Sequence, residues 1–194
     1  MNEQLQLAAV ILAAGESSRM GRPKPLLRYQ GVTFLDRLIS CFTGVASPIV
    51  VVLGYAAAEI RAGVESGDRV EFVVNPDPSR GMLSSLQCGL ATLPQPADGV
   101  FFMPADLPRL RRSTVEKLAA AAGPLVIPRF DGRNGHPVRV SADIARELLG
   151  LPITAKASDV IHRHRAAFLD VDDPGVLYDV DTPAEYDALV GAAP

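Results

Sequence analysis

The sequence has no tryptophan, few other aromatic residues and only two cysteines. Aromatic residues make up 6 % of the 194 residues, and the formal net charge is −3. Binding of nucleic acid through a basic surface needs clustered Lys and Arg, so the composition argues against nucleic acid as a partner. Cys41 and Cys88 lie far apart and form no Cys-x-x-Cys pair. We therefore expect two core thiols rather than a disulfide or a metal site.

Long apolar runs are also missing. The longest, Leu7 to Ala14 and Ile49 to Ala58, fall well short of the roughly 18 residues that a membrane-spanning helix needs, so we expect no membrane span. The first residues, Met1 to Gln4, lack the basic region of a signal peptide. This predicts that residues 7–14 form a strand and that the protein is cytoplasmic.

The residues that are present suit a folded domain. Apolar residues make up 48 % of the chain and charged residues 21 %, which is enough to fill a core and excludes an intrinsically disordered chain. The length is near the roughly 150 residues that are typical of one domain. No repeat or linker divides the sequence, and Pro94 to Pro96 is too short to separate domains. We expect a single domain over residues 1–194.

Short apolar runs alternate with helix-like stretches, which is typical of βαβ units. The sequence predicts an α/β fold: a Rossmann-like, mostly parallel sheet with helices on both faces. Strands are expected at 8–13, 49–53, 70–74, 99–103, 125–129 and 177–180, and helices at 33–42, 57–63, 84–93, 113–122, 142–149, 156–163 and 184–190. Expected helix N-caps are Thr33, Ser84, Ser113 and Thr182. Two glycine turns between Phe130 and Pro137 predict a hairpin that enters a mixed part of the sheet.

The loop after the first predicted strand combines glycine with positive charge. It runs from Leu12 to Lys24 and includes Gly15, Arg19 and Gly21. Ligands bind at the carboxyl ends of strands in open α/β sheets, glycine lets backbone N–H groups approach an anion, and Arg and Lys neutralise phosphate charge. The loop is therefore predicted to hold phosphates, although it matches neither a Walker A loop nor G-x-G-x-x-G. The alternative is a solvated turn with surface cations.

Two aspartates follow predicted strands. Asp106, between Pro104 and Pro108, is well placed to hold Mg²⁺, which takes one or two protein carboxylates together with phosphate oxygens and water. Its alternative role is to cap the turn before the next helix. Asp181 either caps the last helix or is the second metal ligand, and its position alone favours the cap. Together with the cationic loop, the pair suggests metal-assisted phosphate chemistry.

Two further segments contribute polar groups. Gly81 precedes a predicted helix with Ser84 and Ser85 in its first turn, and such a helix N-terminus binds an anion or hydrogen-bonds a polar ring. His136 lies on the predicted hairpin, where an isolated histidine is more often structural or merely exposed than functional.

Taken together, these motifs resemble the MobA-like nucleotidyltransferase family and, within it, the molybdenum cofactor cytidylyltransferases. The resemblance covers about the whole chain. It rests on Leu12-Ala13-Ala14-Gly15 through Arg19-Met20-Gly21 and Lys24, Gly81-Met82 with Ser85-Leu86, Pro104 to Pro108, Gly135-His136-Pro137, and Asp181-Thr182-Pro183. The Ala13-Ala14 pair and the Gly-His-Pro element favour the cytidylyl branch.

The resemblance implies a reaction and a set of roles. The donor would be CTP, and the acceptor would be the phosphate of molybdopterin carrying molybdenum. Implied partners are a target molybdoenzyme apoprotein of the xanthine dehydrogenase type or its chaperone. Implied nucleotide-binding residues are Leu12, Ala13, Ala14, Gly15, Arg19, Lys24, Gly81 and Ser85; Lys24, Arg19 and Asp106 would be catalytic, Asp106 and Asp181 would hold Mg²⁺, and His136 would lie on the acceptor side.

Other functions remain compatible with the sequence. A guanylyl or other nucleotidyltransferase with a different phosphate acceptor would use the same loop and aspartates. A reductase is disfavoured by the missing G-x-G-x-x-G. A carrier that binds molybdopterin or a nucleotide without turnover would not need Lys24, Asp106 and Asp181 together.

Overall fold

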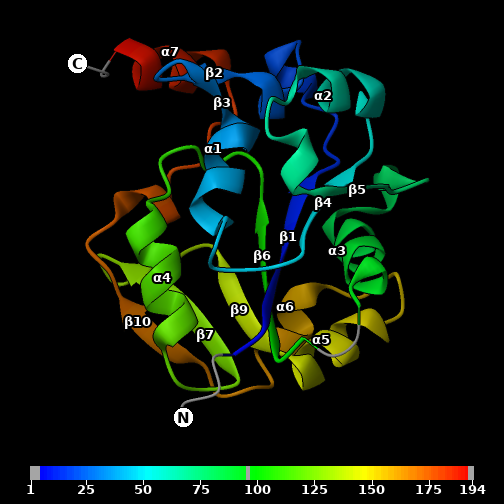
Figure 1. Ribbon diagram of the computed structural model, residues 1–194, viewed down its shortest axis with the longest axis vertical. Helices are drawn as coiled ribbons and strands as arrows, with labels where there is room; N and C mark the ends of the chain where they lie inside the picture. Colours follow the sequence, from blue (N-terminus) through cyan, green and yellow to red (C-terminus); the bar gives the residue numbers. More distant parts are fainter. Residues whose placement is uncertain (1–4, 95–96, 192–194) are drawn as a thin grey trace.

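The central strand of the molecule is β1 (Leu7–Ala13), which is apolar and buried along its whole length. The computed structural model describes residues 5–94 and 97–191. In it β1 pairs parallel with β4 (Ile49–Leu53) on one side and with β6 (Gly99–Pro104) on the other (Figure 1). The segment Met1 to Gln4 lies outside the described residues, as does most of Pro94 to Pro96.

The sheet is mostly parallel, as predicted. Within the described residues it has eight strands in the order β10-β7-β9-β6-β1-β4-β5, with β8 paired to β7. The remaining strands are β5 (Glu71–Val74), β7 (Leu125–Phe130), β8 (Arg133–Asn134), β9 (Val138–Ser141) and β10 (Ala167–Asp170). Strand β9 runs antiparallel to both β6 and β7, and β8 forms the expected hairpin with β7.

Helices cover both faces of the sheet, which confirms the α/β class. Along β1, Ala9, Ile11 and Ala13 contact one core cluster, which also includes residues of α1 (Phe34–Phe42), α2 (Ala57–Gly63) and α4 (Arg112–Ala120). The alternate residues, Val10 and Leu12 among them, contact a second cluster with α3 (Met82–Thr92), α5 (Ala142–Leu149) and α6 (Ala157–Ile161). This two-residue period is the one that a strand buried on both faces requires.

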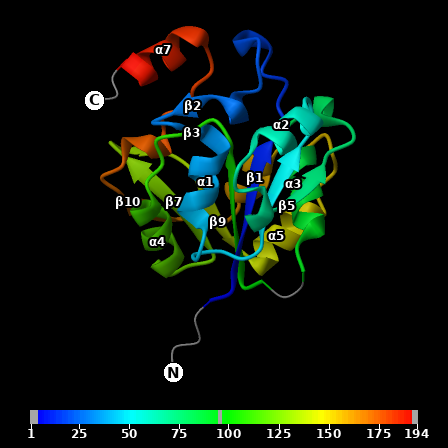
Figure 2. The ribbon, with the colours of Figure 1, turned by 45° about the horizontal axis from the view of Figure 1, so that its top comes forward.

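A third, smaller cluster lies over the carboxyl end of β1. It joins α7 (Pro183–Gly191) to the two-stranded hairpin of β2 (Arg28–Tyr29) and β3 (Val32–Thr33) through Met20, Leu27, Phe34, Val180 and Leu189. Figure 2 shows α7 and this hairpin together above the sheet. The last helix is thereby brought next to the loop that follows β1.

One predicted strand is wrong, and the edge strand β10 and the short strands β2 and β3 were not predicted. Residues 177–180 form no strand; Val180 is fully buried in the third cluster, and its N–H donates to the Asp106 carbonyl at 3.0 Å. The edge strand is instead β10 (Ala167–Asp170), which pairs parallel with β7. Its residues alternate between half-buried and exposed, so it lacks the apolar run that marks a central strand.

Two of the four predicted helix caps are wrong. Thr33 does cap α1, since its hydroxyl accepts from the Asp36 N–H, and the Thr182 hydroxyl accepts from the Glu185 N–H at the start of α7. Helix α3, however, begins at Met82 with Gly81 as its N-cap, and α4 begins at Arg112. Ser84 and Ser113 therefore lie inside the helices. No helix within the described ranges is both long and apolar enough to cross a membrane.

Candidate active site

A cavity of about 280 Å³ opens where β1 and β6 end. This size is near the lower end of the roughly 300–1,000 Å³ usual for small-molecule sites, which suits one nucleotide moiety. Seven of the predicted nucleotide-binding residues line it: Leu12, Ala13, Ala14, Gly15, Lys24, Gly81 and Ser85. Pro104, Ala105 and Asp106 form another part of its wall. The predicted phosphate loop and the strand carrying Asp106 thus meet at one site.

The loop after β1 folds back on itself and so presents Lys24 to the cavity. The Ser17 hydroxyl accepts from the Lys24 N–H at 3.1 Å, and the Met20 N–H donates to the Ser17 carbonyl at 2.9 Å. Gly21 has φ of +66°, a conformation that L side chains rarely adopt. A side chain at Gly15 would meet no atom within 4 Å, so space beside its backbone is open for a ligand.

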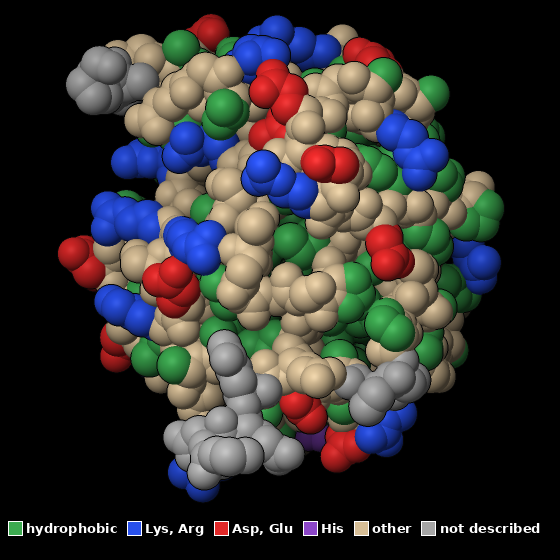
Figure 3. Space-filling model, in the orientation of Figure 1, with side chains coloured by type: hydrophobic (Ala, Val, Ile, Leu, Met, Phe, Trp, Pro, Cys, Tyr) green, Lys and Arg blue, Asp and Glu red, His purple; other side chains and the backbone are tan. Residues whose placement is uncertain are grey.

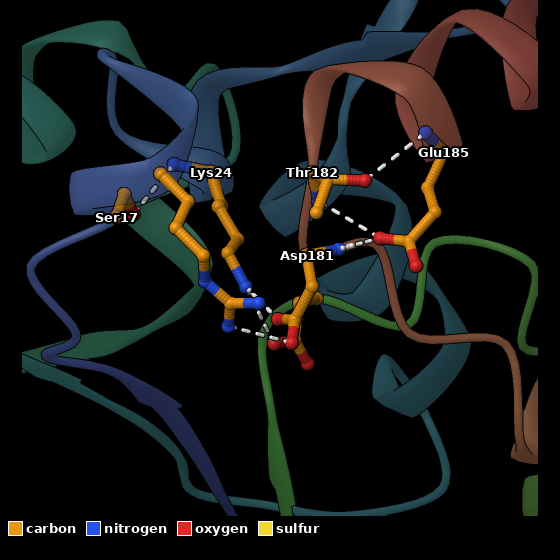
Figure 4. A network of polar contacts seen from close by, with 7 residues as sticks. Ser17, Lys24, Asp181, Thr182 and Glu185 are labelled. Carbon is orange, nitrogen blue, oxygen red and sulfur yellow. Dashed lines mark hydrogen bonds and ion pairs between the residues drawn. The ribbon is translucent and has the colours of Figure 1, made fainter.

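Lys24 lies between two carboxylates from distant parts of the chain (Figure 4). Its Nζ is 2.5 Å from Asp181 Oδ1 and 3.2 Å from Asp106 Oδ2. Arg19 reaches the same group, with Nη2 2.7 Å from Asp181 Oδ2. Four of the charged residues predicted to act on phosphate and metal therefore form one ion-pair network.

The network perturbs the acidity of its members. Burial acts to lower the pKa of Lys24, but the hydrogen bonds and charges of Asp181 and Asp106 outweigh it, so the pKa is raised. The hydrogen bond from Lys24 lowers the pKa of Asp181, with Arg19 assisting. Burial raises the pKa of Asp106 despite the neighbouring ammonium. Lys24 is therefore firmly cationic, whereas burial makes the Asp106 carboxyl group easier to protonate than an exposed aspartate.

The Asp106 carboxylate has an unused coordination position. Its Oδ1 is buried and has no hydrogen-bond partner within the described part of the chain, an arrangement that costs free energy unless something binds there. The Asp181 carboxylate contacts the same lysine, so two carboxylates, the ligand type that a hard divalent cation takes, are close to one another. In residues 5–94 and 97–191 no group of three or more His, Cys, Asp and Glu is placed to hold a metal. A cation here would draw its other ligands from substrate and water.

The capping role of Asp181 that its position favoured is wrong. Helix α7 is capped by Thr182, and the Glu185 carboxylate accepts from the N–H groups of Asp181 and Thr182, each at 2.8 Å. This is the reciprocal arrangement of a capping box. The Asp181 carboxylate instead pairs with Lys24 and Arg19 (Figure 4).

The start of α3 forms the wall opposite Lys24. Ser84 and Ser85 do not cap this helix. Instead, both hydroxyls accept from the Asn75 side-chain amide, at 2.9 and 3.0 Å. Asn75 is buried directly after β5, so it fixes the helix to the carboxyl edge of the sheet. The first N–H groups of a helix have no partners within it, and Gly81 and Met82 of this one line the cavity.

Three predicted residues lie beside the cavity rather than in its wall: Arg19, His136 and Asp181. Arg19 does not line it but reaches Asp181 from an exposed position. His136 is also absent from the lining; its N–H donates to the Val176 carbonyl, and its buried Nδ1 has no partner in the described segments. Burial lowers the pKa of His136, against opposing effects of the Phe102 backbone and Asp179. This histidine is therefore next to the strand that carries Asp106 at its end.

Sequence reasoning missed several residues of the site. Ser17, Pro25, Pro78 and Met82 line the cavity, and Asn75 supports it. Asn75 carried a usable signal, since it is a polar residue directly after the apolar run Phe72-Val73-Val74 and before Pro76. Met82 belongs to the Gly81-Met82 motif but was given no role, and Ser17, Pro25 and Pro78 were given none because only the fold brings them to the cavity.

Comparison with protein families agrees with this geometry. Residues 9–167 match the family model described as the MobA-like NTP transferase domain. The chain is 25 % identical over 178 residues to the molybdenum cofactor cytidylyltransferase of Escherichia coli K12, covering 91 % of this chain and 92 % of that protein.

Solved structures share the whole fold. A homologue of Rv0371c from Mycobacterium sp. strain JC1 superposes with a TM-score of 0.84 at 30 % identity, covering 96 % of each chain. Rv0371c of Mycobacterium tuberculosis H37Rv, in a structure described as a complex with manganese, gives a TM-score of 0.81 at 29 % identity, covering 97 % of this chain and all of that one. A divalent cation therefore accompanies this fold in a similar protein.

Proposed function

The chain belongs to the MobA-like NTP transferase family and is a nucleotidyltransferase of that family; from this premise we propose that it transfers CMP from CTP to the phosphate of the molybdenum cofactor, releasing pyrophosphate. The similarity to the E. coli cytidylyltransferase extends over nearly the whole of both chains, which favours this reaction. We also propose that residues 1–194 act as one catalytic domain, since the two large core clusters pack on the two faces of one eight-stranded sheet.

One observation carries the proposal: Lys24 lies between Asp106 and Asp181 at the wall of a cavity formed by the glycine loop and the start of α3. A nucleotidyl transfer needs positive charge around the α-phosphorus and a pair of carboxylates for a divalent cation. Both occur here within one hydrogen-bonded network. A carrier without turnover has no need of this pairing.

The chain's own residues have distinct roles in the proposed reaction. Gly15 and the first turn of α3 bind the triphosphate through backbone N–H groups, while Lys24 and Arg19 neutralise its charge. Asp106 and Asp181 would hold Mg²⁺, which when bound neutralises charge on the α-phosphate and orients it. The acceptor oxygen bonds to the α-phosphorus as the bond to the pyrophosphate oxygen breaks, and pyrophosphate leaves.

The acceptor needs no general base from the protein. A phosphate monoester has a second pKa of about 6, so it is already largely ionised at neutral pH. The absence of a Ser-His-Asp or Cys-His arrangement among the predicted site residues therefore suits this chemistry. We assign His136 to the acceptor side, because it lies near β6 but outside the nucleotide cavity.

The choice of CTP rests on the narrowness of the nucleotide cavity. Ala13 and Ala14 both line this cavity, and we propose that alanine rather than glycine at these positions leaves less room for the base. A misfit of methyl size costs roughly 1 to 3 kcal/mol, which penalises the larger purine. The proposed macromolecular partner is a molybdoenzyme apoprotein or its chaperone, which would receive the dinucleotide product.

A pyrophosphate-release assay tests the proposal. CTP, GTP and ATP are each supplied with Mg²⁺, with and without molybdenum cofactor as acceptor. The proposal requires release that depends on both CTP and the cofactor. Cofactor-dependent release with GTP but not with CTP would assign the protein to the guanylyl branch. No release with any nucleotide in the presence of the cofactor would exclude this acceptor.

A further inference from the structure

A second, more polar cavity lies beside residues 109–112, which follow Asp106 in the chain. Its volume is about 460 Å³, and four arginines line it: Arg37 from α1, Arg109 and Arg111 from the segment before α4, and Arg112 at the start of α4. In Figure 3, blue Lys and Arg side chains gather on the left of the visible face, at the height of α1 in Figure 1. This concentration of positive charge contrasts with the net charge of −3 for the whole chain.

Two of these arginines are partly neutralised. Arg112 Nε is 2.8 Å from Glu116 Oε1, and Arg111 Nε is 3.8 Å from Asp173 Oδ1. The Asp173 carboxylate is almost fully buried and also accepts from the Arg111 N–H, the Thr114 hydroxyl and the Gly175 N–H. These hydrogen bonds satisfy the Asp173 carboxylate but do not remove its charge, so the cavity wall carries four guanidinium groups and one carboxylate.

The other two arginines have no carboxylate partner within the described residues. Arg37 Cζ is 4.8 Å from the centre of the Tyr29 ring, and Arg109 Cζ is 4.9 Å from that of Tyr178. Arg37 donates through Nε to the Pro108 carbonyl at 2.9 Å, which leaves its terminal nitrogens available. Stacking on an aromatic ring orients a guanidinium, so less entropy is lost when the group binds an anion.

We propose that this cavity is a second anion site, which binds a phosphate-bearing small molecule through Arg37 and Arg109. Guanidinium groups donate paired hydrogen bonds that match phosphate oxygens. A hollow of this volume suits a small ligand better than a flat contact with an acidic protein segment would. The site is independent of the nucleotide cavity, because the two share no lining residue.

Isothermal titration calorimetry with inorganic pyrophosphate in metal-free buffer tests the proposal. Measurements in a Lys24→Ala background remove the main cation of the nucleotide cavity. Each lost guanidinium is expected to weaken binding roughly tenfold, so Arg37→Gln with Arg109→Gln weakens it about a hundredfold. The matched control is Arg165→Gln, an exposed arginine that lines neither cavity, and it should bind as the parent does.

Circular dichroism confirms that the variants fold. If the double variant does not fold, the single variant Arg109→Gln, at an exposed position, replaces it.

The remaining outcomes decide the ligand class. Competition by both inorganic phosphate and CMP supports recognition of the phosphate group, and competition by CMP alone supports a nucleotide ligand. Equal binding by the parent and the Arg37/Arg109 variant overturns the site. Tighter binding of hexaglutamate than of pyrophosphate overturns the small-molecule ligand in favour of an acidic protein segment. Each of these results is independent of whether CMP transfer occurs.

Discussion

At the scale of single residues, the unpaired oxygen of Asp106 is the feature that most directly implies a metal. We predict that Asp106→Asn lowers kcat at least about 100-fold, or ~2.7 kcal/mol of transition-state stabilisation, while the protein stays folded. The change is nearly isosteric but removes the charge that a cation needs. Steady-state kinetics over a range of Mg²⁺ concentrations measure the effect. Asp143→Asn, at an exposed position on α5, is the control, and near-normal activity of the Asp106 variant would exclude the metal role.

Lys24 makes a different prediction, because its charge meets phosphate in the transition state. Lys24→Ala should lower kcat far more than it raises KM, since the charge that Lys24 neutralises grows as the bond to pyrophosphate breaks. Lys117→Ala, near the end of α4, controls for the loss of a lysine. A rise in KM with unchanged kcat would assign Lys24 to substrate binding alone.

His136 gives a prediction for stability against pH. Burial lowers its folded-state pKa, so the unfolded chain binds a proton more readily. The stability that this group contributes is therefore fully present above the unfolded pKa of about 6.5 and is lost as pH falls below it, by up to about 1.4 kcal/mol per pH unit. Urea unfolding of wild type and His136→Gln at pH 7.5 and pH 5.5 should show a smaller loss in the variant. An equal loss in both would contradict this account, and His162→Gln removes an exposed imidazole as the control.

At the scale of elements, the contact of α3 with the sheet holds one wall of the site in place. A Cβ at Gly89 would lie 2.5 Å from Val10 Cγ1 and 2.8 Å from Val52 Cγ2. We predict that Gly89→Ala destabilises the protein by about 1–3 kcal/mol through overpacking. Gly191→Ala, whose Cβ would meet nothing within 4 Å, should change stability by no more than about 0.5 kcal/mol. Chemical denaturation measures the free energy of unfolding of the two variants. Equal changes would show that α3 moves freely to accept the methyl group.

Helices and strands that are determined by their own residues could be predicted from the sequence. Apolar runs such as Ile49–Leu53 identified the central strands, and Thr33 identified the start of α1. The edge strand Ala167–Asp170 was missed because half of its surface is exposed, so its pairing with β7 rather than its composition defines it. Residues 177–180 were mistaken for a strand because Leu177, Tyr178 and Val180 are apolar, but tertiary contacts with the first and third clusters explain these side chains.

In the candidate site, too, some residues could be predicted from the local sequence and others only from tertiary contacts. The residues of the glycine loop and Asp106 were found because they follow apolar strands, and parallel strands bring their carboxyl ends to one edge. The role of Asp181 was left open because a cap and an ion pair look alike in sequence. Only the fold shows that Thr182 and Glu185 cap α7 and that Asp181 faces Lys24.

At the scale of the whole molecule, the carboxyl edge of the sheet gathers charged groups from both ends of the chain. Lys24 and Arg19 follow the first strand, Asp106 follows β6, and Asp181 precedes the last helix. Helix α7 and the β2–β3 hairpin hold the third core cluster above this edge (Figure 2). The site therefore depends on the complete fold rather than on one local motif.

The central claim is that this edge transfers CMP to the molybdenum cofactor, and competition between nucleotides tests it most directly. The protein is given equal concentrations of CTP and GTP with Mg²⁺ and molybdenum cofactor, and the dinucleotide product is identified by mass. The account predicts mostly the cytosine dinucleotide, because a cavity of about 280 Å³ lined by Ala13 and Ala14 is expected to favour a pyrimidine over the larger purine. Mostly guanine dinucleotide would contradict the choice of base, and no dinucleotide with either base would contradict the acceptor as well.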